Sequence, residues 1–277
     1  MGRPYADGDR LASAGDTRQR PLRLHNFLHT RVIGVQPSLT ATALRPTALQ
    51  APTRLALPRQ KQLPFSLAGA LLVALPVFLQ APWVRLAPFS AALFTAPLLL
   101  LGALLAFQGH GRWRDAGALL VGFSGSWLGG CLFWGWFRLH PLWHLPIEAF
   151  ALPLALGGLR SRWRLAASFY LASLLGTACT DGVMALTGVM QRWTEVLNAP
   201  LDQAALLLHQ AALQVMQPFP LAITLLAGAL LIQLCRRTWQ HPDPAWRLAA
   251  SAVATTLAVD GLFLAAALWA PRLSGLI

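Results

Sequence analysis

The stretch ALLVGFSGSWLGGCLFWGWF, residues 118–137, decides the class of fold. It contains no charged residue, and a helix of about 20 apolar residues is long enough to cross roughly 30 Å of hydrocarbon. Within it Ala118, Gly122, Ser126 and Gly130 recur at every fourth position, so four small side chains share one helix face. Small residues let helix backbones approach closely in lipid, and this span is therefore expected to be a central packing element.

The whole chain is poor in charge. Its 277 residues are 56% hydrophobic and 12% charged, whereas soluble domains carry about 25% charged residues. Residues 1–63 hold nine Arg and one Lys without a sustained apolar period, and we expect this segment to be disordered. A transit peptide and a misassigned start codon are the alternatives for it. Elsewhere basic residues alternate with apolar runs instead of lining one face, which argues against nucleic-acid binding.

Residues 64–272 are expected to form an all-α, polytopic transmembrane helical bundle with the lipid bilayer as its partner. The candidate spans are 64–80, 87–107, 115–137, 141–159, 165–190, 217–235 and 248–270. The fourth is doubtful, because its purely apolar part is too short to cross.

Arginine placement supports all seven spans. With the N-terminus inside, the inner segments hold 18 of the 22 Lys and Arg residues. The outer segments hold one each, at Arg85, Arg138, Arg192 and Arg272. This distribution follows the positive-inside bias. Without the fourth span the pattern breaks, so we predict seven spans with a cytoplasmic N-terminus and the C-terminus outside.

Three spans that start on the inner side open on a Trp-Arg pair, at residues 113–114, 163–164 and 246–247. The last two pairs extend to an identical WRLAAS, and the same spans later carry Thr-x-x-x-Asp-Gly at 177–182 and 256–261. Independent interfacial anchors and an internal repeat both explain the similarity. Between these spans, a helix near 200–216 combines a glutamine face with an apolar one and is expected to lie along the membrane interface.

Three acidic residues, Glu148, Asp181 and Asp260, fall well inside spans, and no Lys or Arg occurs at their depth. Burial disfavours a charged carboxyl group, so each should hold a proton or bind a cation. Intramembrane acids often mark transport pathways or proton relays. A protonated Asp can also join helices by hydrogen bonds, and this structural role is the alternative.

His140, His144 and Glu148 lie four residues apart, the spacing of one helix face. Such a set can ligate a transition metal or pass protons toward Glu148. Pro141 and Pro146 interrupt the helix, however, and the neighbouring Trp residues are typical of an interfacial aromatic belt. We therefore assign no metal here, keep both histidines as candidates for a proton or cation entrance, and leave any cofactor unknown.

Motifs for catalysis are weak. Gly122-Phe-Ser124-Gly125 resembles the G-x-S-G of rhomboid proteases, but the later spans lack the histidine that would serve as base. No P-loop, dinucleotide-binding or H-E-x-x-H motif is present in the sequence. No catalytic residue is assigned.

Three stretches carry a family resemblance: LPVFLQAPWVR (75–85), FTAPLLLLG (94–102) and WLGGCLFWGWFRLHPLWHLPIEAFALPLALGGL (127–159). They resemble an uncharacterised family of cyanobacterial integral membrane proteins, known as a domain of unknown function. The resemblance covers roughly residues 65–270. It implies a bacterial inner (plasma) or thylakoid membrane, and it implies no activity or cofactor.

Two functions fit these observations. A permease for a small solute or cation would bring the three carboxyl groups together on a water-accessible cavity. A non-catalytic assembly or scaffold factor for a photosynthetic or respiratory membrane complex would keep them dispersed, each satisfied locally.

Overall fold

The structure is a computed structural model that describes residues 64–273, and the regular elements in that range are all helical. This confirms the prediction of an all-α bundle. The disorder predicted for residues 1–63 lies outside the described residues. The α-helices are α1 (Phe65–Leu75), α2 (Ala81–Leu86), α3 (Pro88–Leu93), α4 (Thr95–Gln108), α5 (Arg112–Leu132), α6 (His144–Glu148), α7 (Leu152–Gly158), α8 (Arg164–Leu186), α9 (Val189–Asn198), α10 (Leu201–Val215), α11 (Pro218–Trp239) and α12 (Pro244–Trp269).

Within the described part of the chain, six helical stretches are long and apolar enough to cross a membrane. Two of them continue through a π-helical turn, at Pro76–Gln80 and at Phe133–Phe137. Six of the seven expected spans are therefore continuous. They are Phe65–Leu86, Pro88–Gln108, Arg112–Phe137, Arg164–Leu186, Pro218–Trp239 and Pro244–Trp269.

The fourth expected span, 141–159, is not a regular helix, and this corrects the prediction. It consists of short pieces: a 3₁₀ turn at Pro141–Trp143, α6, a second 3₁₀ turn at Ala149–Ala151, and α7. Proline lacks the backbone N–H and clashes with the preceding turn, and the segment contains three prolines, at 141, 146 and 153.

The broken segment nevertheless runs from one end of the bundle to the other. At its start the indole of Trp193, beyond the end of α8, donates to the carbonyl of Arg138 at 3.1 Å. At its end the ring of Trp163, before α8, lies 5.8 Å from that of Phe107 at the end of α4. The segment therefore returns the chain to the end at which α5 begins.

Tyr170 on α8 compensates for the break in hydrogen bonding. Its hydroxyl donates to the carbonyl of Glu148 and accepts from the N–H of Ala151 at 3.1 Å. Irregular backbone at membrane depth is tolerated only where protein groups or water satisfy it. The Tyr170 hydroxyl thus hydrogen-bonds backbone groups at both ends of the 3₁₀ turn between α6 and α7.

Helix α5 is the most buried of the six spans, with more than half of its apolar window inside the protein. At Gly122 an added Cβ would lie 2.5 Å from the carbonyl oxygen of Ala166 on α8. The other members of the small-residue stripe are distributed differently: Ala118 and Gly130 are buried, and Ser126 is half-buried. The indole of Trp127, also on α5, donates to the carbonyl of Ala91 at 2.9 Å and packs among aromatic rings.

The arginine-rich connectors meet at one end of the bundle. The guanidinium of Arg162 lies 4.4 Å from the ring of Phe107, and Arg164 forms an ion pair with Asp243 at the start of α12. The connectors after α4, α7 and α11 are therefore neighbours. This is the end that the arginine count assigns to the inner side of the membrane.

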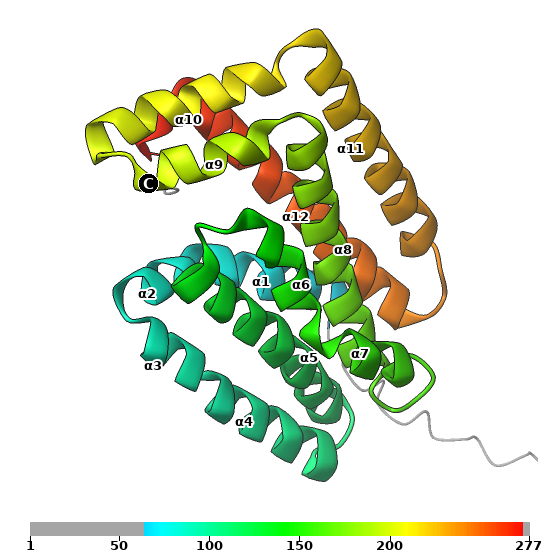
Figure 1. The fold of residues 1–277 in the computed structure, drawn as a ribbon. Helices are drawn as coiled ribbons and strands as arrows, with labels where there is room; N and C mark the ends of the chain where they lie inside the picture. The colour runs from blue at the N-terminus through cyan, green and yellow to red at the C-terminus, as the bar shows by residue number, and fades with distance from the viewer. Residues whose placement is uncertain (1–63, 274–277) are drawn as a thin grey trace, which may run out of the picture. The chain divides into compact units, whose positions relative to one another are not determined.

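At the opposite end, α9 and α10 lie across the bundle between α8 and α11 (Figure 1). Helix α10 occupies the range near 200–216 in which an interfacial amphipathic helix is expected. Its buried side is rich in alanine, and three apolar side chains on or next to it are exposed: Leu206, Leu213 and Met216. Together α9 and α10 cover the space between α8 and α12 that contains the candidate site.

Candidate functional site

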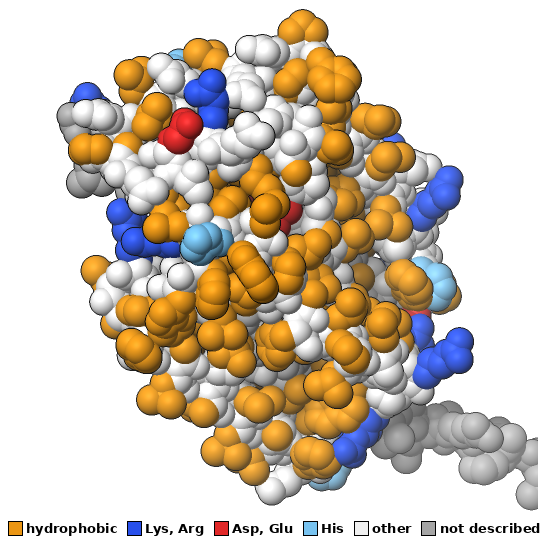
Figure 2. Space-filling view, in the orientation of Figure 1, with side chains coloured by type: hydrophobic (Ala, Val, Ile, Leu, Met, Phe, Trp, Pro, Cys, Tyr) orange, Lys and Arg blue, Asp and Glu red, His pale blue; other side chains and the backbone are white. Residues whose placement is uncertain are grey.

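One large cavity, of about 1070 Å³, lies between α8, α12, α6 and the covering helices α9 and α10. Its lining includes all three intramembrane acids, Glu148, Asp181 and Asp260, together with His144. Figure 2 shows an acidic side chain in the middle of a largely hydrophobic face, over the crossing of α8 and α12. The cavity therefore combines a polar centre with mostly apolar walls.

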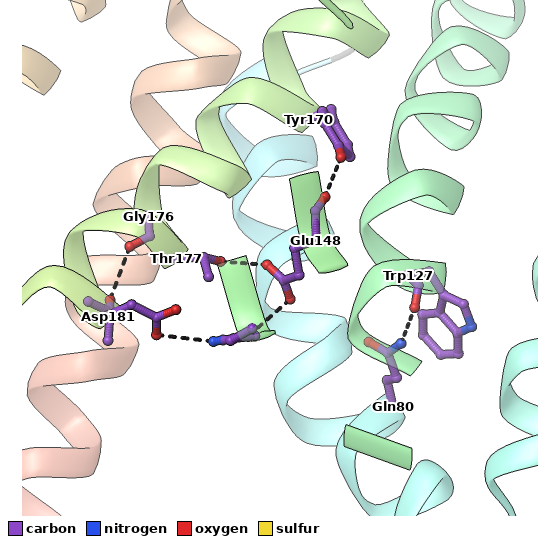
Figure 3. Close-up of polar contacts among 9 residues, drawn as sticks. Gln80, Trp127, Glu148, Tyr170, Gly176, Thr177 and Asp181 are labelled. Carbon is purple, nitrogen blue, oxygen red and sulfur yellow. Dashed lines mark hydrogen bonds and ion pairs between the residues drawn. The ribbon is translucent and has the colours of Figure 1, made fainter. Parts of the chain in front are cut away.

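His144 joins two of the acids, Glu148 and Asp181, whose carboxyl groups are shown in Figure 3. Its Nδ1 lies 3.1 Å from Oδ1 of Asp181, and its Nε2 lies 3.3 Å from Oε1 of Glu148. All three side chains are largely buried: the solvent-exposed fraction is 19% for His144, 17% for Glu148 and 14% for Asp181. We call these three residues the His-acid trio.

Threonines on α8 extend the trio. The hydroxyl of Thr177 donates to Oε2 of Glu148 at 2.7 Å, and that of Thr180 donates to Oδ2 of Asp260 at 2.6 Å. Thr177, Thr180 and Asp181 fall within two turns of α8, so this helix connects the trio with Asp260 on α12. All three carboxyl groups thus belong to one polar cluster.

Local structure holds the trio in place. Glu148, at the end of α6, accepts a hydrogen bond from Thr177 on α8. Its backbone lies so close to α5 that a Cβ at Gly129 would be 3.1 Å from the Cα of Glu148, so a residue without a side chain avoids a tight contact at position 129. The imidazole of His144 stacks on Phe133, with ring centroids 4.0 Å apart. That ring belongs to the π-helical turn that ends α5, and such turns frequently mark functional sites.

The trio is suited to moving a proton. One imidazole that hydrogen-bonds two carboxyl groups needs a proton in each of the two bonds. An imidazolium between two carboxylates satisfies this requirement, and so does a neutral imidazole between one carboxylate and one carboxylic acid. Both arrangements carry a net charge of −1. A proton can therefore pass between His144 and either acid without changing the charge of the cavity.

The structure brings together four of the five residues that the sequence proposed for the site. Glu148, Asp181, Asp260 and His144 share the cavity, whereas His140 is exposed and its described hydrogen bonds use only its backbone. His140 does not share a helix face with His144 and Glu148, because α6 begins only at His144, after the interruption at Pro141.

Other candidate chemistry finds no support in the described residues. Residues 64–273 contain no group of three or more His, Cys, Asp or Glu side chains arranged to hold a metal ion. In the trio the nitrogens and oxygens contact one another directly. Ser124 of the G-x-S-G motif is buried and donates to the carbonyl of Val121 at 2.8 Å, so it packs as a small helix residue.

Sequence reasoning missed several residues around the cavity. Thr180 gave no signal of its own, and Tyr170 was detectable only as a lone tyrosine in an apolar span. Arg85, Arg138 and Arg192 entered the topology count one by one, yet all three line the cavity. Their proximity to one cavity depends on how α2, α9 and the connector before Pro141 pack, which no local pattern encodes.

The family comparison covers most of the chain. Residues 69–268 match the model of a family described as "Protein of unknown function (DUF3120)". Neither the curated proteins nor the solved structures contain a match to this chain. Because the matched region exceeds half of the sequence, the chain belongs to the DUF3120 family, as the resemblance to a domain of unknown function indicated.

Proposed function

We propose that this DUF3120 protein is a permease for a small solute. The polar cluster of Glu148, His144, Asp181 and Asp260 would be the part of the pathway that binds a proton or another cation. One observation carries the proposal: three intramembrane acids from three segments, joined through His144 and two threonines, line a single cavity. Polar groups at membrane depth are costly, and they occur mainly where they serve transport or relay protons.

The alternative, an assembly or scaffold factor for a membrane complex, fits this geometry less well. A scaffold needs no cavity, and it would keep its buried acids dispersed at separate places in the bundle. Here His144 contacts two acids at once, and a cavity of about 1070 Å³ surrounds the cluster. The arrangement therefore favours a solute pathway.

Reconstitution tests the proposal. The full chain is placed in vesicles that contain a pH-sensitive dye, and a potassium diffusion potential drives cations inward. We expect influx of protons or of radioactive sodium above that of protein-free vesicles. Asp181→Asn should abolish this influx and Asp260→Asn should lower it, with normal expression of both variants. Asp115→Asn, in the first turn of α5 and away from the cluster, is the matched control and should leave the influx unchanged.

The opposite result is equally definite. If neither ion enters faster than in protein-free vesicles, and the protein purifies from native membranes in a stoichiometric complex, the assembly role replaces the permease. Normal influx in both Asp variants would show that the acids are structural.

A further inference from the structure

The described structure places three arginines on the same cavity as the acids. Arg85 lies in the last turn of α2, Arg138 follows the π-helical turn after α5, and Arg192 lies on α9. They are three of the four basic residues that the sequence assigns to the outer side of the membrane. Three segments that are distant in sequence thus each contribute an arginine to the lining of one cavity.

Among the described side chains, those of residues 64–272 except 201–202, no acidic group pairs with these guanidinium groups. The ion pairs there are those of His144 with Glu148 and Asp181 and that of Arg164 with Asp243. Arg192 is positioned by a neutral group instead: its Nε donates to Oε1 of Gln214 at 2.6 Å, and the amide of Gln214 donates to the carbonyl of Thr187 at 2.8 Å. The acids of the cavity, in contrast, already have partners in His144 and the threonines.

The net charge of the cavity lining is nevertheless positive, because three guanidinium groups outweigh the net charge of −1 on the trio and at most −1 on Asp260. Arginine presents a planar set of N–H donors that matches a carboxylate or phosphate group, and it is the residue of choice for binding such anions. The walls add a second constraint, because most lining side chains are apolar. A cavity of about 1070 Å³ with apolar walls suits an organic molecule better than a hydrated inorganic ion.

We infer that the solute is a small organic anion, an apolar body with a carboxylate or phosphate group that Arg85, Arg138 and Arg192 bind. The inference rests on the proposed permease function and names its substrate class. A positively charged cleft with low-dielectric walls raises the local concentration of anions and their association rate, by roughly tenfold or more. This rate effect is the measurable consequence.

Cys179 provides a reporter, because its thiol lines the cavity beside Thr180 and Asp181. Cys131 and Cys235 are replaced by Ser, and Cys179 is modified with anionic or cationic methanethiosulfonate reagents in vesicles of neutral lipid. Each rate is divided by that for a free thiol. We expect the anionic reagent to react about tenfold faster than the cationic one, with a preference that weakens as salt rises.

Variants connect the preference to the arginines. Arg138→Gln and Arg192→Gln should each reduce the anionic preference several-fold. Arg272→Gln should not change it, because Arg272 is exposed at the same end but does not line the cavity. Benzoate should also slow the modification of Cys179, whereas benzylammonium, a cation of similar size, should not.

The outcomes separate the two proposals. A faster reaction with the cationic reagent would overturn the anion inference and leave the permease intact. Failure of both reagents to reach Cys179 would show that the cavity is closed to water, and would overturn the permease as well. Protection by phosphatidylglycerol but not by benzoate would assign the arginines to a lipid headgroup and reject a soluble substrate.

Discussion

The region around α5 and the region between α8 and α12 are built from similar apolar helices, yet the first is closely packed and the second contains a cavity. Around α5, glycines bring backbones into contact, and Trp127 and Phe123 fill the remaining space. Between α8 and α12, threonines and acids line a cavity whose walls are otherwise mostly apolar. In lipid, helix association depends on close packing and hydrogen bonds more than on hydrophobicity. Small residues close one region, and polar residues line the other.

Both regions also contain a buried amide or carboxyl group, and the comparison shows how each is satisfied. Gln80 is buried, and its Nε2 lies within hydrogen-bonding distance of the carbonyl of Trp127 and the thiol of Cys131. Glu148, in contrast, is satisfied by His144 and Thr177, which are ionisable or hydroxylic and face a cavity. The first group is a fixed part of the core, and the second can exchange protons.

The largest effect should come from filling the α5–α8 contact. Gly122→Ala places a methyl group 2.5 Å from the carbonyl oxygen of Ala166 and 2.7 Å from its Cα. Because these are backbone atoms that cannot rotate away, we expect a cost of about 3 kcal/mol or more, at the upper end of the usual range for overpacking. We expect a clear fall in the midpoint of thermal aggregation in detergent. Gly182→Ala on α8 is the control, since nothing lies within 4 Å of its added Cβ, and it should be neutral or slightly stabilising. Equal midpoints for both variants would refute the close contact.

The next effect concerns the trio. His144→Gln removes an imidazole that contacts two carboxyl groups, and the loss of hydrogen bonds to charged partners costs roughly 1.5–3 kcal/mol. We expect lower thermal stability together with loss of the influx. His140→Gln should change neither property, because its side chain is exposed and outside the cluster. A His140 variant with the stronger effect would show that the wrong histidine has been placed at the site.

A smaller effect is expected for the link between α8 and α12. Thr180→Val keeps the shape of the side chain but removes the donor to Asp260, at a cost of about 1 kcal/mol. Thr255→Val is the control, because its hydroxyl bonds only to the carbonyl of Ser251 one turn earlier. Thermal denaturation in detergent compares the two. If the Thr255 variant is the less stable, Thr180 does not connect the helices.

The smallest effect should come from Gln80. Gln80→Leu replaces the buried amide by an apolar group of similar size. Trp127 lies inside α5, so its carbonyl keeps the intrahelical hydrogen bond and is not left unsatisfied. We expect a stability change below about 1 kcal/mol and an unchanged influx, although Gln80 also lines the cavity. Loss of the influx in this variant would show that Gln80 belongs to the functional cluster.

Prediction from sequence succeeded where the information is local. The apolar runs identified six continuous spans. The fourth span failed as a helix because three prolines outweighed its apolar composition. Its course from one end of the bundle to the other was still indicated by Arg160, Arg162 and Arg164, since their connector lies beside the end of α4.

The cluster itself was only partly predictable. Glu148, Asp181 and Asp260 were found because a carboxyl group in an apolar run is conspicuous at any position. The spacing indicated the contact of His144 with Glu148, but not the contact of His144 with Asp181, which depends on how α6 packs against α8. Thr180 was missed for the same reason: its partner lies 80 residues away on α12.

By itself, the sequence determined which segments are apolar enough to cross a membrane, where proline interrupts them, and which acids lie among apolar residues. These properties depend on the transfer of each segment from water to lipid, a local quantity that can be read along the chain. Only the tertiary structure decided that Tyr170 hydrogen-bonds the backbone of the irregular segment 141–159, that His144 joins two acids, and that three arginines line the same cavity. Those contacts depend on the register and crossing of helices distant in sequence, which packing at glycines such as Gly122 sets and composition does not.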